Sequence, residues 1–153
     1  KLEYATTENP FAGRVICGSC GQVFGRKVWN STDDRLRRII WRCNGKYVEK
    51  GKKGCDSRHI DDRVLYQAFI WVFNALVENR ELFMKKCRDR LVSGNVLVRY
   101  KSKQLIETIS GAERVTEFDV NLYFSMVEKV TVHAGKRLTI NLLDGTEVEC
   151  EFE

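Results

Sequence analysis

Four cysteines are the residues of this chain best suited to chemistry. Cys17 and Cys20 form a C-x-x-C pair on a glycine-flanked turn, and Cys43 and Cys55 follow at wider spacing. Four thiolates satisfy the tetrahedral shell that zinc adopts in closed structural sites. The spacing therefore predicts one structural Zn²⁺ held by all four cysteines. Because four protein ligands leave no open position on the ion, no reaction is expected at the metal.

The sequence also allows other roles for these cysteines. His59 stands four residues after Cys55 and is the alternative fourth ligand. A redox C-x-x-C pair is less favoured, because such a pair normally opens a helix and here strands follow a glycine-rich turn. A disulfide framework is also disfavoured, since a chain of 153 residues is too large to need such staples. Cys87 and Cys150, in a predicted helix and strand, are expected to be small buried hydrophobes.

Positive charge is concentrated in the cysteine-bearing segment. The net charge of the chain is +5, but residues 14–58 hold 12 Lys and Arg against 4 Asp and Glu, a local charge of +8. Residues 59–153 hold 13 against 15, a local charge of −2. This asymmetry favours an anionic partner for the first segment, and nucleic acid is preferred over a merely solvated face. The predicted DNA-binding residues are Arg26, Lys27, Arg38, Arg42, Lys46, Lys52, Lys53 and Arg58.

The elements that must position these residues follow from pattern and turn chemistry. Residues 1–10 are expected to be a linker or arm, and residues 11–59 an irregular zinc β-ribbon. Within the ribbon, the strand-like segments 22–30 and 35–43 flank a turn of Asn, Ser, Thr and Asp, which predicts a β-hairpin. Residues 60–153 are expected to form a helical core with a C-terminal β-meander that packs with the ribbon as one domain.

Hydrophobic spacing places the helices and strands of this second part. Helices are predicted over 61–78, 81–92 and 96–110, with Asp61 and Asp62 at the start of the first. A weak capping box at Thr116 predicts a further short helix that reaches Met126. Apolar and polar residues then alternate from 130 to 152, which predicts three short antiparallel strands. The fold class is thus α+β, with a zinc ribbon, a small helical core and a three-stranded C-terminal sheet.

Alternation along the second ribbon strand orients its basic residues. Cys43 must face the metal, so Arg38 and Arg42 are expected on the outward face, with Arg26 of the partner strand as a third reading residue. The tryptophans at 29 and 41 are more readily explained as cover between ribbon and helices than as stacking platforms for nucleotides. Trp71 is expected in the core, and the chain offers no apolar run long enough to span a bilayer.

Several phrases resemble the zinc β-ribbon region of large serine recombinases. In that family an N-x-F-x-G phrase runs into C-G-x-C-G, as in Asn9-Pro10-Phe11-Ala12-Gly13 and Cys17-Gly18-Ser19-Cys20-Gly21 here. An aromatic or basic residue precedes the third cysteine, as in Trp41-Arg42-Cys43. The end of the chain is also similar, at Phe118-Asp119, Val127-Glu128-Lys129-Val130-Thr131-Val132 and Leu143-Asp144-Gly145-Thr146-Glu147.

The resemblance implies a C-terminal DNA-binding region that recognises attachment-site or transposon-end half-sites. In that family a separate N-terminal domain carries the serine nucleophile, so this segment is expected to be inert alone. The implied partners are double-stranded DNA and other recombinase subunits in a dimer or tetramer, with no membrane and no small-molecule substrate. The implied location is the cytoplasm, for a bacterial or phage-encoded protein acting on the chromosome. The alternative function is a zinc-ribbon module that binds an acidic protein and has no role on DNA.

Overall fold

Two β-sheets and four helices make up the described part of the chain, which is residues 4–47 and 50–153 of a computed structural model. Residues 1–3 of the predicted arm at 1–10, and positions 48–49 of the ribbon region, lie outside these residues. The three-stranded sheet has the order β2-β3-β4, and the four-stranded sheet has the order β1-β5-β6-β7. The strands are β1 (Val15–Cys17), β2 (Phe24–Trp29), β3 (Arg38–Cys43), β4 (Ile60–Asp61), β5 (Val127–His133), β6 (Arg137–Leu142) and β7 (Glu147–Glu151). The helices are α1 (Asp62–Glu78), α2 (Arg80–Arg90), α3 (Val96–Ser110) and α4 (Val120–Met126), with a 3-10 turn η1 (Asn44–Tyr47).

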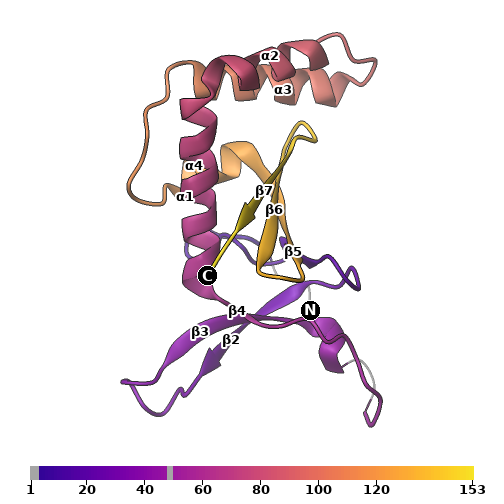
Figure 1. The fold of residues 1–153 in the computed structure, drawn as a ribbon, viewed down its shortest axis with the longest axis vertical. Helices are drawn as coiled ribbons and strands as arrows, with labels where there is room; N and C mark the ends of the chain where they lie inside the picture. The colour runs from indigo at the N-terminus through magenta and orange to yellow at the C-terminus, as the bar shows by residue number, and fades with distance from the viewer. Residues whose placement is uncertain (1–3, 48–49) are drawn as a thin grey trace.

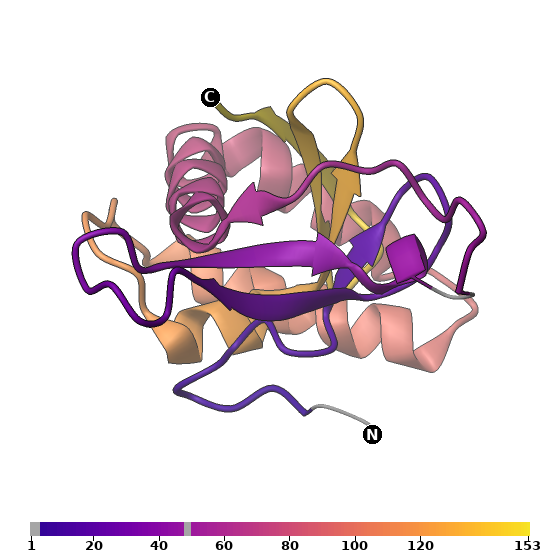
Figure 2. The same ribbon diagram turned by 90° about the horizontal axis from the view of Figure 1, so that it is seen from below.

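The predicted α+β class is confirmed. Helix α1 runs along the long axis of the molecule. Figure 1 shows α1 rising from the β2–β3 ribbon at one end of the molecule to the α2–α3 hairpin at the other. The predicted C-terminal meander is present as β5, β6 and β7, antiparallel throughout. The ribbon therefore lies at the opposite end of the molecule from α2 and α3, and Figure 2, seen from below, shows the ribbon running across the front of the molecule.

Strand β1 adds a feature that alternation alone did not predict. It pairs in parallel with β5, with Val15 opposite Val130 and Cys17 opposite Val132. The apolar residues 11–16 favour a strand that runs into the C-x-x-C turn, but its partner lies more than a hundred residues away and is set by the fold, so no local signal predicts the pairing. The pairing places the first cysteine of the cluster at the edge of the C-terminal sheet.

The core forms where α1 packs against both sheets. Phe11, which follows the only proline, is fully buried and makes edge-on ring contacts with Trp41, Tyr66 and Tyr123. The side chain of Asp61 accepts a hydrogen bond from the backbone N–H of Arg63 and so caps α1. The fully or nearly buried residues of α1 recur at helical spacing: Val64, Leu65, Ala68, Phe69, Val72, Phe73 and Leu76.

Two sequence predictions about the helices are wrong. Trp71 is not in the core: its side chain is 57% exposed, because it falls between the buried positions 68, 69, 72 and 73 and so faces outward. The N-cap of α4 is Asp119 and not Thr116, since the Asp119 carboxylate accepts from the N–H groups of Asn121 and Leu122. Hydrophobic periodicity predicted the positions of α1 and α4. Tertiary packing decided which face of α1 is buried and which residue caps α4.

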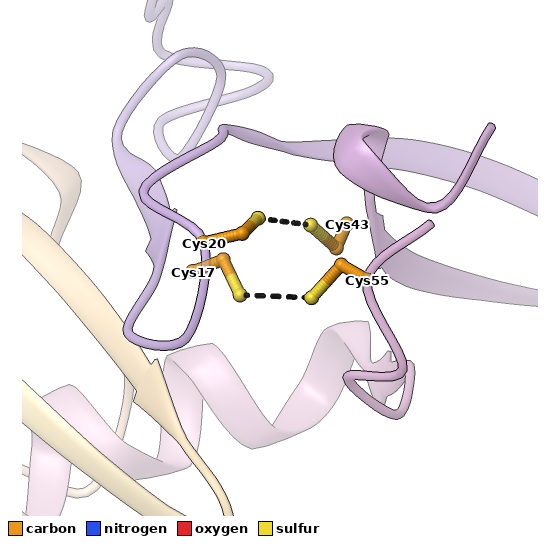
Figure 3. Close-up of side chains that lie close together, drawn as sticks. All are labelled: Cys17, Cys20, Cys43 and Cys55. Atoms are coloured by element: carbon orange, nitrogen blue, oxygen red, sulfur yellow. Dashed lines mark hydrogen bonds between the residues drawn. The ribbon is translucent and has the colours of Figure 1, made fainter. Parts of the chain in front are cut away.

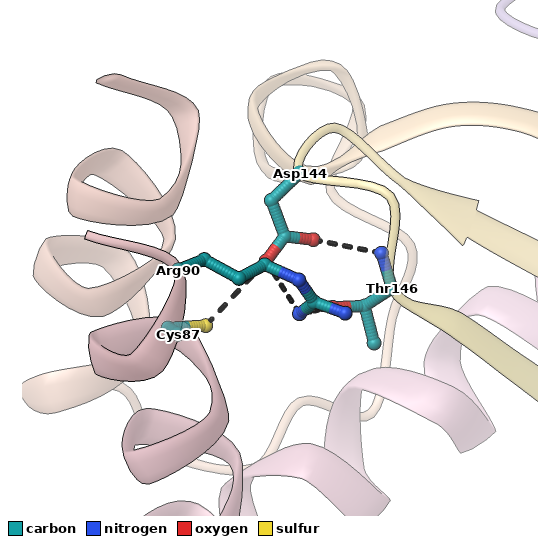
Figure 4. A network of polar contacts seen from close by, with 4 residues as sticks. All are labelled: Cys87, Arg90, Asp144 and Thr146. Carbon is teal, nitrogen blue, oxygen red and sulfur yellow. Dashed lines mark hydrogen bonds and ion pairs between the residues drawn. The ribbon is translucent and has the colours of Figure 1, made fainter. Parts of the chain in front are cut away.

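A polar contact fixes the α2–α3 hairpin to the C-terminal sheet. Asp144, in the β6–β7 turn, has a fully buried side chain and pairs with Arg90 of α2 at 3.0 Å. The same carboxylate accepts from the backbone N–H of Thr146, and Arg90 also donates to the Thr146 hydroxyl. Figure 4 shows these groups converging from the end of α2 and the turn. The Asp144-Gly145 pair is typical of a two-residue hairpin turn, and the sequence gives no sign of the contact with Arg90.

Candidate metal centre and nucleic-acid interface

The four predicted cysteine ligands come together at one point. Their sulfur atoms all lie within 4.8 Å of one another, with Cys17 and Cys55 at 3.7 Å and Cys20 and Cys43 at 3.4 Å. Figure 3 shows the four side chains pointing inward from the β1 turn, the end of β3 and the loop before β4. A tetrahedron with Zn–S bonds of ~2.3 Å separates its sulfurs by about 3.8 Å. The cluster therefore has the donors and the spacing that a tetrahedral metal ion requires.

Tight backbone turns explain why the four sulfurs meet. The turn after Cys17 closes with a hydrogen bond from Gly21 N–H to the Cys17 carbonyl at 2.9 Å, and Gly21 has a φ of +77°, which favours glycine. At the second turn, a Cβ on Gly45 would lie 2.9 Å from the Cys20 sulfur. Gly45 also donates its N–H to the Cys43 sulfur at 3.3 Å. Only a residue without a side chain fits this close to the cluster.

The approach of Cys55 depends on a third glycine. A Cβ on Gly54 would meet the carbonyl oxygens of Gly45 and Lys46 at 2.4 and 2.3 Å. This close passage lets Cys55 donate its N–H to the Gly45 carbonyl at 3.1 Å. The irregular spacing before Cys55 is thus accommodated by a loop that folds back over η1.

A serine supports the cluster from outside. The Ser57 hydroxyl lies 3.0 Å from the Cys17 sulfur and 3.1 Å from the Cys55 sulfur. Burial raises the pKa of Cys17, but hydrogen bonds from Ser57 and from the backbone of Cys20 and Ser19 bring that pKa down to about 6. Hydrogen bonds of this kind hold a thiolate in place and tune a bound metal. Sequence reasoning missed Ser57, because no pattern distinguishes it from a loop serine.

His59 is not part of the sulfur cluster. Its Nε2 atom instead lies 3.3 Å from a guanidinium nitrogen of Arg38, and its ring packs on Trp29 with centroids 4.4 Å apart. Since a guanidinium has only donors, the Nε2 atom accepts and the imidazole is neutral. Burial, followed by the nearby charges of Arg38 and Lys46, lowers the His59 pKa below its ordinary value.

The remaining two cysteines lie away from the cluster and are buried. Burial raises the pKa of the Cys87 thiol to about 12 and that of Cys150 to about 11. The Cys87 sulfur is 3.8 Å from the Asp144 carboxylate, which further opposes a negative charge on the thiol. Both cysteines are therefore inert packing residues of the core.

Pairing between β2 and β3 sorts the basic residues of the ribbon onto two faces. Trp29 pairs with Arg38 and Lys27 pairs with Ile40, so these side chains share the face away from the core. Arg26 pairs with Trp41 on the opposite face. The pairing therefore places Arg26 on the other face from Arg38 and Arg42, with Lys27 beside them, and DNA contact by each of these residues stays a prediction.

Each of the two outward arginines lies over an aromatic ring. The guanidinium carbon of Arg38 is 4.8 Å from the centre of the Trp29 ring, and that of Arg42 is 5.0 Å from the centre of the Tyr47 ring. Tyr47, at the end of η1, is 70% exposed. The sequence offers no signal for Tyr47 as a partner of Arg42, because the glycine- and lysine-rich segment 44–54 has no pattern that predicts a 3-10 turn.

The two ribbon tryptophans differ in exposure. Trp41 is fully buried and donates its indole N–H to Asp62, so it covers the junction with α1 and has no face free for a nucleotide. Trp29 is half-buried between Arg38 and His59.

The predicted basic residues are largely unpaired with acids. Lys27, Lys53 and Arg58 are exposed, and Lys46 lies in η1. Lys52 lies in the same loop as Lys53. Across residues 4–47 and 50–153, no salt bridge involves Arg26, Lys27, Arg38, Arg42, Lys46, Lys53 or Arg58. Their charges are therefore available to an external anion. None of the helices in these two ranges is both long enough and apolar enough to cross a lipid bilayer.

Four clustered cysteines at the end of a β-hairpin define a zinc-ribbon type of domain. The third of them, Cys43, is the last residue of the second hairpin strand. Residues 10–74 match the family model described as the recombinase zinc beta ribbon domain. This match, over less than half of the chain, confirms the resemblance to recombinases seen in the sequence.

A solved structure extends the likeness beyond the ribbon. A crystal structure of an LSR–DNA complex, LSR standing for large serine recombinase, matches the fold with a TM-score of 0.58 at 14% identity. The match covers 93% of this chain and 57% of that chain, so this chain corresponds to little more than half of it. At this identity the match establishes a shared fold that includes the helices and the C-terminal sheet. No curated protein sequence matches the chain.

Proposed function

We propose that this chain binds duplex DNA in a sequence-specific manner as the DNA-recognition part of a serine site-specific recombinase. The observation that carries the proposal is the set of unpaired basic residues on a ribbon whose family is that of recombinases. The fold shared with an LSR–DNA complex supports it. The DNA recognised would be an attachment-site or transposon-end half-site. The ribbon would enter its major groove, which admits a two-stranded ribbon.

The metal of the proposed site is one Zn²⁺ per chain. Cys17, Cys20, Cys43 and Cys55 would hold it as thiolates, and Ser57 would donate to two of them. The ion supplies a structural crosslink and no reactive position. Its loss would therefore remove the shape of the ribbon that presents the basic residues.

Catalysis belongs, in this proposal, to a serine-bearing domain elsewhere in the parent protein. Integration or excision of DNA would then occur in a dimer or tetramer of recombinase subunits, in the cytoplasm of a bacterial or phage-infected cell. The present chain contributes site recognition and takes no small-molecule substrate.

The test is binding of the zinc-loaded chain to duplex DNA at several salt concentrations. Each phosphate neutralised by Lys or Arg releases counterions, so log K should fall linearly with log salt at ~0.9 per phosphate contact. The double substitution R38A/R42A should weaken binding, whereas R88A on α2 removes the same kind of charge from the opposite end of the molecule and should not. Salt-independent binding, or binding only to acidic proteins, would favour the alternative interaction module.

A further inference from the structure

The outward face of the ribbon presents two arginines that are each stacked on a ring. Arg38 lies over Trp29, and Arg42 lies over Tyr47. Between the two arginines, Ile40 is fully buried but is not part of the main core cluster. A guanidinium on an aromatic face loses little further freedom when it makes a hydrogen bond. Stacked arginines are therefore better suited to fixed, directional contacts than to mobile phosphate contacts.

Arg38 is held from a second side. The neutral His59 ring accepts a hydrogen bond from its Nη2 atom at 3.3 Å and itself packs on Trp29. Each Nη atom of a guanidinium carries two hydrogens, so Arg38 keeps an edge with two free donors. Within residues 4–47 and 50–153, no carboxylate forms a salt bridge with Arg38 or Arg42.

The spacing of the two arginines matches a spacing in DNA. A strand rises ~3.4 Å per residue, so Cα atoms four positions apart on one strand are about 14 Å apart. Successive bases of a B-DNA strand rise ~3.4 Å, so the same distance spans about four base pairs. The commonest base-specific contact is an arginine that donates two hydrogen bonds to O6 and N7 of guanine.

We propose that Arg38 and Arg42, oriented by Trp29 and Tyr47, each read one guanine in the major groove, with the two guanines about four base pairs apart. This inference rests on the proposed DNA-binding function. Trp29, Tyr47 and His59 are positioning residues, and Lys27 on the same face would contact the phosphates beside the groove.

The experiment selects bound duplexes from a pool with about twenty randomised base pairs, using the full 153-residue chain loaded with zinc. The unmodified chain should enrich duplexes with two guanines at the stated spacing. R42A should erase the preference at one guanine and R38A at the other, each by roughly tenfold against the other bases. R88A should leave the selected sequence unchanged.

Variants of the rings separate positioning from mere folding. Y47F keeps the ring and should keep the preference read by Arg42, whereas Y47L should relax that preference alone. Zinc content and thermal melting of each variant verify that it is folded. If Y47L leaves the preference intact while R42A removes it, the stacking role is overturned.

Two further outcomes distinguish this inference from the proposed function. If the chain enriches a sequence but R38A and R42A weaken all sequences equally, the arginines contact phosphates and the inference fails while the function stands. If the unmodified chain binds no duplex in the pool at low salt, the proposed function fails, and the inference fails with it.

Discussion

Trp41 of β3 donates its indole N–H to the Oδ1 atom of Asp62 across 2.7 Å. Trp41 is fully buried, and Asp62 is the first residue of α1. The bond joins the ribbon to the N-terminal turn of the axial helix, where a carboxylate also interacts favourably with the helix dipole. The direction of the ribbon relative to α1 is thus fixed by a charge-assisted hydrogen bond as well as by apolar packing.

Removing that acceptor should destabilise the whole chain. D62A leaves the buried indole N–H of Trp41 without a partner, which costs about 1–3 kcal/mol of unfolding free energy. D62N retains an acceptor oxygen and should cost less. Urea unfolding followed by tryptophan fluorescence measures both, and equal losses for the two variants would show that the hydrogen bond is not the cause.

The fourth metal ligand should be Cys55 and not His59. C55S should abolish stoichiometric zinc binding, because three thiolates no longer complete the tetrahedron that folds the ribbon. H59Q should retain one zinc per chain, since His59 faces Arg38. Elemental analysis of protein prepared without added metal measures the content, with C87A as a control that alters a buried cysteine outside the cluster. A clearly substoichiometric zinc content in H59Q would reverse the assignment.

His59 should make stability depend on pH in one direction. Burial and the cations Arg38, Lys46 and Arg42 lower its folded pKa, with Asp61 opposing them. The unfolded chain, with a His pKa of about 6.5, then binds the proton more readily than the folded chain. The contribution is therefore fully present above pH ~6.5 and is lost as the pH falls through the lower folded value.

Nuclear magnetic resonance of the imidazole protons tests this directly. The chain has two histidines, and H59Q assigns the signal of His59 by its disappearance. The His59 signal should titrate below pH 6.5, and H59Q should show a weaker loss of stability as the pH falls from that value. Zinc content is checked at each pH so that metal release is not mistaken for the histidine. A His59 midpoint above 6.5 would contradict the neutral acceptor role.

The ion pair between Arg90 of α2 and Asp144 of the β6–β7 turn should contribute more to the unfolding free energy than an ordinary surface ion pair. R90A leaves the fully buried Asp144 carboxylate without its cation, and breaking a buried pair costs ~3–5 kcal/mol. The Arg90 side chain is 34% exposed, so the lower part of that range, about 3 kcal/mol, is expected. R88A on the same helix removes an exposed charge and should change the unfolding free energy by less than about 0.5 kcal/mol. Equal losses for the two variants would make the Arg90 contact energetically unimportant.

Much of this fold is readable from the sequence because its signals are local. A short stretch of sequence is enough to predict each of several elements: the C-x-x-C turn, the hairpin strands, the alternating C-terminal segment and the three longer helices. The stack of Arg42 on Tyr47 depends on how η1 folds back, and the pairing of β1 with β5 depends on chain segments far apart. Such contacts are set by tertiary packing and have no local pattern.

The structure departs from these local signals at two residues. The hydrophobicity of Trp71 predicts a core position, but its place on the helix faces outward between the buried residues of α1. The register of β2 against β3 places Arg26 on the other face from Arg38 and Arg42, and a register is fixed only when the paired residues are known. A hydrophobic pattern thus predicts how many faces of an element are buried, but it does not predict which residues pair across neighbouring strands.

The sulfur cluster draws its members from both sheets. Cys17 is the last residue of β1 in the four-stranded sheet, and Cys43 is the last residue of β3 in the three-stranded sheet. A metal ion held there makes the two sheets thermodynamically interdependent, because neither can separate without breaking metal–thiolate bonds. Unfolding of the metal-bound chain should accordingly be one cooperative transition, and stripping the ion should divide that transition into two steps with the ribbon melting first.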